Sequence, residues 1–294
     1  MEGVNLTLGR YMTPVGAESF FVNENINVTR GLLWTIQPVN HTGGYIGGAC
    51  ECGLSWQLGA SNGYGNTMAD TDTEPTFVGS VGYKMDTLGF KLNGVYGGNI
   101  DDLLGGLTTF GLVGNSPFST PTAPSVATFG TGFERNNDKI GLLDAVLTWN
   151  PSEALTTWLN FDYWWTQNKG SGTNTSNLGA LNIWGIAGAG RYAITEATGF
   201  ALRYEYLQFF NSGDTDADLM EVTATLDHHL TDHLVLSAEG RWDRGRADGA
   251  ADTIYLANTT GGSAAVGSGI TLGDFLADEA NHQVLGLVQL RYDF

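Results

Sequence analysis

The sequence predicts an all-β protein, a transmembrane antiparallel up-and-down β-barrel, and three observations support this fold class. Extended segments with alternating polar and apolar residues recur along the whole chain, and short connections alternate with long polar ones. No window approaches the roughly 18 uninterrupted apolar residues that a membrane helix needs. The composition agrees, because 42 Gly, 14 Phe, 11 Tyr and 8 Trp stand beside only 15% charged residues among the 294. Residues 1–294 are expected to form a single barrel domain.

About 11 segments have the two-residue period of a β-strand. In chain order the expected strands are 4–12, 43–60, 76–85, 88–98, 138–150, 153–167, 180–193, 196–210, 218–229, 232–245 and 281–294. Short connections fall at 84–89, 150–154, 193–198 and 228–233, and long ones at 61–75, 99–137, 168–179, 211–217 and 246–280. In outer-membrane barrels short turns face the periplasm and long loops face outward. The last strand is therefore expected to end at the periplasmic rim.

The segment "LTTWLNFDYWWTQ" shows which face of the strands meets lipid. One face carries Leu155, Leu159, Phe161, Tyr163 and Trp165, and the other carries Thr156, Asn160, Asp162 and Thr166. The strands at 196–210 and 232–245 repeat this pattern, with charged residues in the middle of the polar face. A soluble barrel would need an apolar core at those positions. The apolar face is therefore expected to face lipid and the polar face a lumen.

Strand parity predicts a chain that is incomplete at its N-terminus. Counting back from a descending last strand, the first of 11 strands also descends. Single-chain bacterial barrels have even strand numbers. We therefore expect truncation from a 12–14-stranded barrel, with a gap or a strained closure between residues 4–12 and 281–294.

Alternation assigns a mixed set of charged side chains to the lumen. The expected pore-lining residues are Glu51, Lys84, Lys91, Asp144, Asp162, Arg191, Arg203, Glu205, Glu221, Asp227, Glu239, Arg241, Asp243 and Arg291. Arg203 and Arg241 beside the acids favour a lumenal salt-bridge ladder over a catalytic carboxylate set. Acids outnumber bases on the wall and in the long connections, and the formal net charge is −18. This balance predicts a mild preference for cations and argues against nucleic acid as a partner.

Cys50 and Cys52 lie two residues apart within the expected strand 43–60. That spacing is too constrained for an ordinary disulfide, and two cysteines are too few for a closed zinc site. Both are expected to be small apolar residues facing lipid, with Glu51 facing the lumen. His228, His229 and His233 are expected in a solvated turn, so neither a metal nor a cofactor is predicted.

Segment 23–37, "NENINVTRGLLWTIQ", has apolar residues at roughly helical spacing. It is expected to be a short helix or folded-in segment at the periplasmic end, where it would narrow the pore. An irregular crossing between strands is the alternative.

Two parts of the chain resemble known outer-membrane proteins. The ending "QLRYDF" is similar to the C-terminal signature strand of bacterial outer-membrane proteins, which implies that Leu290, Tyr292 and Phe294 are an assembly signal read by the barrel-assembly machinery. Residues 6–44 resemble β-barrel porin family 2 (OmpL-like) in Gly9-Arg10, Gly16-Ala17-Glu18, the segment from Asn23 to Arg30, and Pro38 with His41-Thr42-Gly43. The resemblance implies a bacterial outer-membrane location among lipid and lipopolysaccharide.

The expected function is that of a porin giving small hydrophilic solutes or ions passive diffusion through a water-filled lumen. A structural or adhesive barrel with a blocked lumen, working through loops 99–137 and 246–280, is the alternative. An enzyme is not expected, because the five histidines form no catalytic motif.

Overall fold

The structure, a computed structural model, describes residues 2–64, 75–97, 139–167, 181–211, 216–247 and 281–292. Within these ranges it contains twelve strands in one sheet. The strands are β1 (Glu2–Met12), β2 (Asn40–Ala49), β3 (Leu54–Asn62), β4 (Pro75–Lys84), β5 (Leu88–Gly97), β6 (Lys139–Ser152), β7 (Leu155–Gln167), β8 (Leu181–Ala193), β9 (Thr198–Asn211), β10 (Asp216–Thr231), β11 (Leu234–Ala247) and β12 (Asn281–Tyr292).

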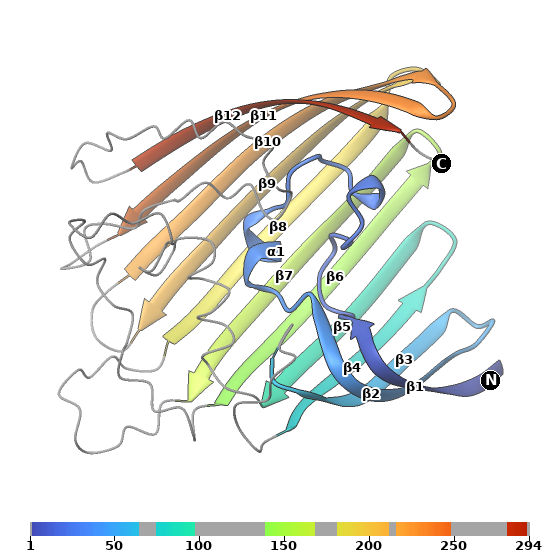
Figure 1. The fold of residues 1–294 in the computed structure, drawn as a ribbon, viewed down its shortest axis with the longest axis vertical. Coiled ribbons are helices and arrows are strands. Elements are labelled where there is room, and N and C mark those ends of the chain that lie inside the picture. The colour runs from blue at the N-terminus through green and yellow to red at the C-terminus, as the bar shows by residue number, and fades with distance from the viewer. Residues whose placement is uncertain are drawn as a thin grey trace.

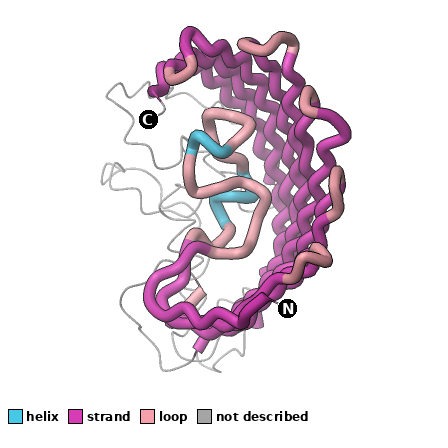
Figure 2. The backbone as a smooth tube through the Cα atoms, turned by 90° about the vertical axis from the view of Figure 1, so that its right-hand side faces the viewer, coloured by secondary structure: helices cyan, strands magenta, loops and turns pink. Residues whose placement is uncertain are grey.

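Each strand pairs antiparallel with its neighbours in the chain, so the sheet has the order β1 to β12 without a crossover. The sheet curls around a concave side (Figure 2). β1 and β12 are its two edges and are not paired with each other, so the expected gap between the first and last strands is present. Both ends of the chain lie on the side of the short turns (Figure 1).

The expected strand 43–60 is wrong, because a turn at 50–53 divides it into β2 and β3. Gly53 has a φ of +90° in this turn, a conformation that glycine adopts without strain. Ala49 pairs with Ser55, so odd-numbered residues keep the same face on both strands and the alternation runs unbroken through the hairpin. The count is therefore twelve, and β1 runs opposite to β12. The odd count on which the expectation of a further strand rested is not observed.

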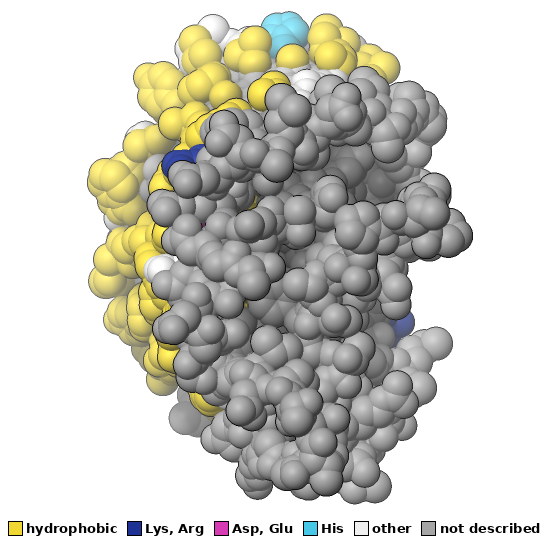
Figure 3. All heavy atoms as spheres, turned by 90° about the vertical axis from the view of Figure 1, so that its left-hand side faces the viewer, with side chains coloured by type: hydrophobic (Ala, Val, Ile, Leu, Met, Phe, Trp, Pro, Cys, Tyr) yellow, Lys and Arg dark blue, Asp and Glu magenta, His cyan; other side chains and the backbone are white. Residues whose placement is uncertain are grey.

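The two faces of the sheet are as predicted. Leu159, Leu202 and Tyr204 are 44–49% exposed on the outer face, whereas Asp162 and Arg203 are fully buried on the inner face. Hydrophobic side chains gather along one flank and the top of the molecule in the view of Figure 3. Among the residues described, no helix has the length and apolar character needed to cross a membrane.

Residues 13–39, called here the inner segment, connect β1 to β2 and lie within the curve of the sheet (Figure 2). The inner segment contains a short 3-10 helix, η1 (Val22–Glu24), and one helical turn, α1 (Leu32–Ile36), so the expected short helix is present. Met12 pairs with Asn40, at the end of the sheet where β3 leads into a long connection. The inner segment therefore enters and leaves at the long-loop end. The segment was expected at the periplasmic end, but its two ends lie at the opposite end, because the unrecognised hairpin reversed the direction assigned to β1. Residues 22–28 do reach the side of the short turns.

Candidate functional site

The inner face of β9, β10 and β11 carries two rows of charged side chains. Strand register places Glu205 and Asp243 on either side of Glu221. It places Arg203 and Arg241 on either side of Thr223 in the adjacent row. Arg241 Nη2 lies 3.0 Å from Glu221 Oε2 and 2.8 Å from Asp243 Oδ1, and Arg203 Nε lies 3.5 Å from Glu205 Oε1. The expected salt-bridge ladder is confirmed.

The two arginines of this ladder also hold the inner segment. Arg203 Nη1 donates to the carbonyl oxygen of Thr29 at 2.6 Å and to Glu18 Oε1 at 2.7 Å. Arg241 Nη1 donates to the carbonyl oxygen of Arg30 at 2.6 Å. Because 13–39 has little regular structure, its backbone carbonyls need such partners when they are buried.

Acids of the wall accept the backbone N–H groups of the same stretch. Glu239 accepts from the N–H of Val28 at 2.7 Å and from that of Thr29 at 2.9 Å. Glu205 Oε2 accepts from the N–H of Leu33 at 2.9 Å. The wall charges therefore position the inner segment, because they supply the hydrogen bonds that a helix or sheet would otherwise provide.

A second polar contact lies on β6 and β7. Asp144 Oδ1 accepts from the N–H of Gly16 at 3.2 Å. The amide of Gln37 donates to Asp162 Oδ2 at 2.6 Å and to Asn160 Oδ1 at 3.2 Å. Both ends of the inner segment are thus bonded to the wall.

Apolar packing completes the attachment. Val15, Leu32, Leu33 and Ile36 pack in one buried cluster with inward-facing side chains of the wall. Those wall residues are Val78, Val95, Ile140, Leu142, Trp164, Ile183, Ala187, Leu207 and Leu219, and Tyr64, just beyond the end of β3, joins them. Trp164 Nε1 donates to Tyr64 Oη at 2.7 Å, and Tyr64 Oη donates to the carbonyl oxygen of Ile36 at 3.2 Å.

Sequence reasoning missed this apolar part of the inner face. The available signal was the placement of tryptophans on both faces of β7, with Trp164 inward and Trp165 outward, which a purely polar wall does not require. The apolar side of α1, which packs against this part of the wall, was indicated by the helical spacing of its apolar residues. The sequence did not indicate that α1 and the apolar part of the wall are in contact.

The expected pore-lining residues fall into distinct groups. Six acids and two bases are at most 5% exposed, namely Asp144, Asp162, Arg203, Glu205, Glu221, Glu239, Arg241 and Asp243. All of them except Glu221 and Asp243 have a hydrogen bond to the inner segment described above. The inward positions that keep solvent contact are Lys84, Lys91, Arg191, Asp227 and Arg291. Arg191 donates to both carboxylate oxygens of Asp227, at 2.9 and 2.6 Å.

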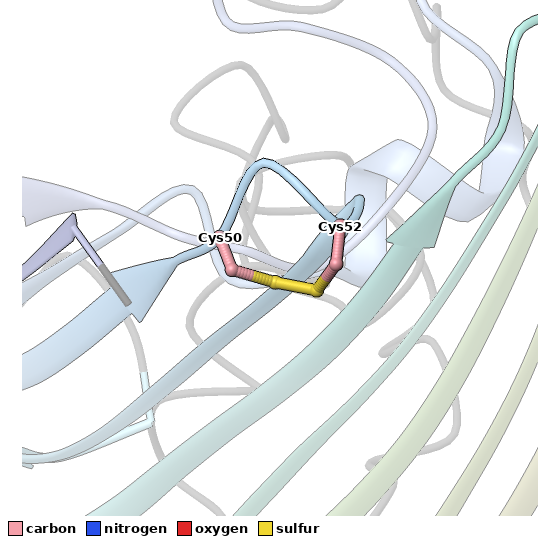
Figure 4. Close-up of a disulfide and its surroundings, with 2 residues drawn as sticks. All are labelled: Cys50 and Cys52. Carbon is pink, nitrogen blue, oxygen red and sulfur yellow. A yellow bond between two sulfur atoms is a disulfide. The ribbon is translucent and has the colours of Figure 1, made fainter.

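Two predictions around the cysteines are wrong. Cys50 and Cys52 form a disulfide in the turn between β2 and β3 (Figure 4). In an extended strand their Cα atoms would be about 6.6 Å apart with both side chains on one face, but the turn brings them to 5.1 Å. Glu51 is exposed in the same turn and does not face the lumen.

The expected assembly signal is described only in part. Leu290 and Tyr292 lie on the outward face of β12 and are 63% and 56% exposed. Phe294 lies outside the described residues.

A cavity of about 310 Å³ lies between the inner segment and the wall, toward the short-turn end of the sheet. It is lined by Val22, Asn23, Glu24, Asn25, Ile26, Asn27, Val28, Thr156, Arg191, Thr225, Asp227, His229, Val235, Ser237, Gln289 and Arg291. Within the described residues no cluster of His, Cys, Asp or Glu is arranged to hold a metal ion.

The apolar exterior, the charged interior and the up-and-down topology agree with one family. The sequence profile described as "Putative beta-barrel porin-2, OmpL-like" matches residues 1–273. The chain belongs to this family. As a member of the porin-2 family it is a porin-like β-barrel of the bacterial outer membrane, as the sequence predicted.

Solved structures show the same fold at low sequence identity. In-vitro folded OmpT of Vibrio cholerae has a TM-score of 0.57 and 13% identity, and the match covers 98% of this chain and 76% of that one. The anion-selective porin from Comamonas acidovorans has a TM-score of 0.51 and 11% identity, over 82% of this chain and 63% of that one. A search of curated proteins found no match.

Proposed function

We propose that this porin-2 member gives small hydrophilic solutes or ions passive diffusion across the outer membrane. The proposal depends on one observation: the sheet has the topology of an outer-membrane barrel, its outer face is apolar and its inner face carries charged side chains. A wet lumen lets a solute cross without leaving water, so no reaction chemistry is needed. The inner segment occupies the lumen beside β6 to β11 and narrows the path.

We further propose a mild cation preference that arises at the mouth of the pore. Most acids of the wall are buried and hydrogen-bonded, so they contribute little field to the open path. The long connections are acidic, with Asp70, Asp72 and Glu74 in one and Asp101 and Asp102 in the next. Salt screens such charges over about 8–10 Å near physiological ionic strength, so the preference is mild and decreases as salt rises.

Expected partners follow from the same surfaces. Outer-membrane lipid and lipopolysaccharide would surround the apolar exterior, and the barrel-assembly machinery would recognise the C-terminal strand through Leu290, Tyr292 and Phe294.

The second candidate function is a structural or adhesive barrel with a blocked lumen. The observation in its favour is the dense packing of the inner segment, where Leu32, Leu33 and Ile36 are each 2% exposed. In that case the long loops 99–137 and 246–280, which lie largely outside the described residues, would perform the function.

Planar bilayer recordings of the full chain across a KCl gradient test both proposals. We expect stable conductance steps and a reversal potential that mildly favours potassium and approaches zero as salt rises. Correctly folded protein without conductance would establish the blocked-lumen alternative. A reversal potential favouring chloride would overturn the cation preference while leaving the porin function intact.

A further inference from the structure

We propose that the 310 Å³ cavity beneath the inner segment is a binding site for a neutral polyhydroxylated solute, a sugar of one or two rings. The inference rests on the proposed function, because it names the class of solute that would use the path. It depends on the charge balance of the lining, on two unpartnered acceptors and on the size and mixed polarity of the cavity.

The formal charges that line the cavity cancel. Glu24 and Asp227 oppose Arg191 and Arg291. Arg191 and Asp227 further neutralise each other through two hydrogen bonds at 2.9 and 2.6 Å. A site without net charge gives neither a cation nor an anion a large electrostatic advantage over a neutral solute.

Two buried acceptors in the lining have no hydrogen-bond partner among the described residues, Asn27 Oδ1 and Gln289 Oε1. Asn27 is 3% exposed, and its amide nitrogen donates to Thr225 Oγ1 at 2.7 Å, which fixes the side chain. A buried acceptor without a partner is unfavourable, because it has lost its hydrogen bonds to water and gained none in the protein. A carboxylate or other fully ionised anion has no hydrogen to donate to it, whereas every sugar hydroxyl can donate and accept.

The remaining lining suits a sugar ring. Val22, Ile26, Val28 and Val235 offer apolar contact to C–H groups, and the hydroxyls of Thr156 and Ser237 offer further hydrogen bonds. A volume of about 310 Å³ lies at the lower end of the range of small-molecule sites, about 300–1,000 Å³. Binding there has to be weak, because a solute that crosses a pore must also leave it.

Equilibrium dialysis of the full chain in detergent, with labelled glucose and sucrose, tests the site directly. Succinate and putrescine are the anionic and cationic comparators. We expect saturable binding of at least one sugar that is tighter than binding of either ion. Asn27→Leu and Gln289→Leu should each raise the dissociation constant about 3- to 10-fold, the loss of one hydrogen bond.

The matched control is Asn5→Leu, which removes an exposed amide on β1 outside the cavity lining and should leave the dissociation constant unchanged. Gln289 lies on β12 and Asn27 in the inner segment, so a folding defect in one variant leaves the other informative. No saturable sugar binding, tighter binding of succinate or putrescine, or wild-type affinity in both variants would overturn the proposal.

Bilayer recordings separate this proposal from the porin function. Sugar binding without conductance would refute the porin and retain the site. Conductance without sugar binding would support the porin function and refute the sugar site. If both hold, added sucrose should reduce single-channel conductance in a saturable manner, and Asn27→Leu should shift the half-saturating concentration by the same factor as in dialysis.

Discussion

Glu18 and Arg203 form an ion pair in which Oε1 and Nη1 are 2.7 Å apart, although 185 positions separate the residues in the chain. The side chain of Arg203 is fully buried and that of Glu18 is 6% exposed. The pair joins the inner segment to the middle of β9. It makes the placement of that segment dependent on the charged wall.

Replacing Arg203 with methionine should strongly destabilise the fold. The change removes the cation that pairs with Glu18 and Glu205, whereas Glu221 keeps Arg241. Removal of one partner of a buried pair costs about 3–5 kcal/mol. Thermal unfolding followed by the shift in gel mobility of the heated barrel measures the effect. Lys84→Met removes an exposed cation at the end of β4 and should change stability by less than about 0.5 kcal/mol. Equal effects of the two variants would contradict the role given to Arg203.

A single methyl group at Gly31 should displace the inner segment. A Cβ at this position would overlap the carboxylate of Glu205, whose Oε2 accepts from the N–H of Leu33. We expect Gly31→Ala to cost about 1–3 kcal/mol by overpacking and to increase protease cleavage within 13–39.

Gly240→Ala is the matched control for Gly31, because nothing lies within 4 Å of a Cβ built there. It should leave both the stability and the cleavage pattern of the full chain close to wild type. A Gly31→Ala protein that resists protease as the control does would show that the contact with Glu205 does not hold the segment.

The cysteines should behave as a disulfide that is reachable from water. Cys50 and Cys52 are paired, and Glu51 and Cys52 between β2 and β3 are exposed. The unreduced protein should not react with maleimide, and after mild reduction a membrane-impermeant maleimide should add twice to each chain. Mass spectrometry of the intact protein reads both results. Double labelling without reductant would show free thiols.

Ion preference should depend on the acidic long connections more than on the buried wall. Asp70→Asn, Asp72→Asn and Glu74→Gln together should lower the cation preference, because these acids have few basic neighbours in the sequence. Glu205→Gln should leave the reversal potential unchanged, because this carboxylate is 1% exposed beneath the inner segment. A changed reversal potential in Glu205→Gln, with no change in the triple variant, would place the selectivity-determining charges on the wall.

Much of the fold could be predicted from local pattern alone. The two-residue period decides which face of a strand a side chain takes, so the faces of β7, β9 and β11 and the ladder of Arg203 and Arg241 with their acids follow from alternation. The same rule failed at 50–53. A hairpin that pairs Ala49 with Ser55 preserves parity, and alternation cannot distinguish it from a continuous strand.

What the sequence determined by itself is therefore the class of fold, an apolar exterior, a charged interior and the presence of a short helix within 13–39. Only the tertiary structure decided where that helix lies, which charges it covers and that Cys50 meets Cys52. The physical reason is distance along the chain. Strand faces are set by neighbouring residues, whereas the contacts of Glu18 with Arg203 and of Leu33 with Glu205 join residues more than 170 positions apart, and no local pattern encodes their meeting.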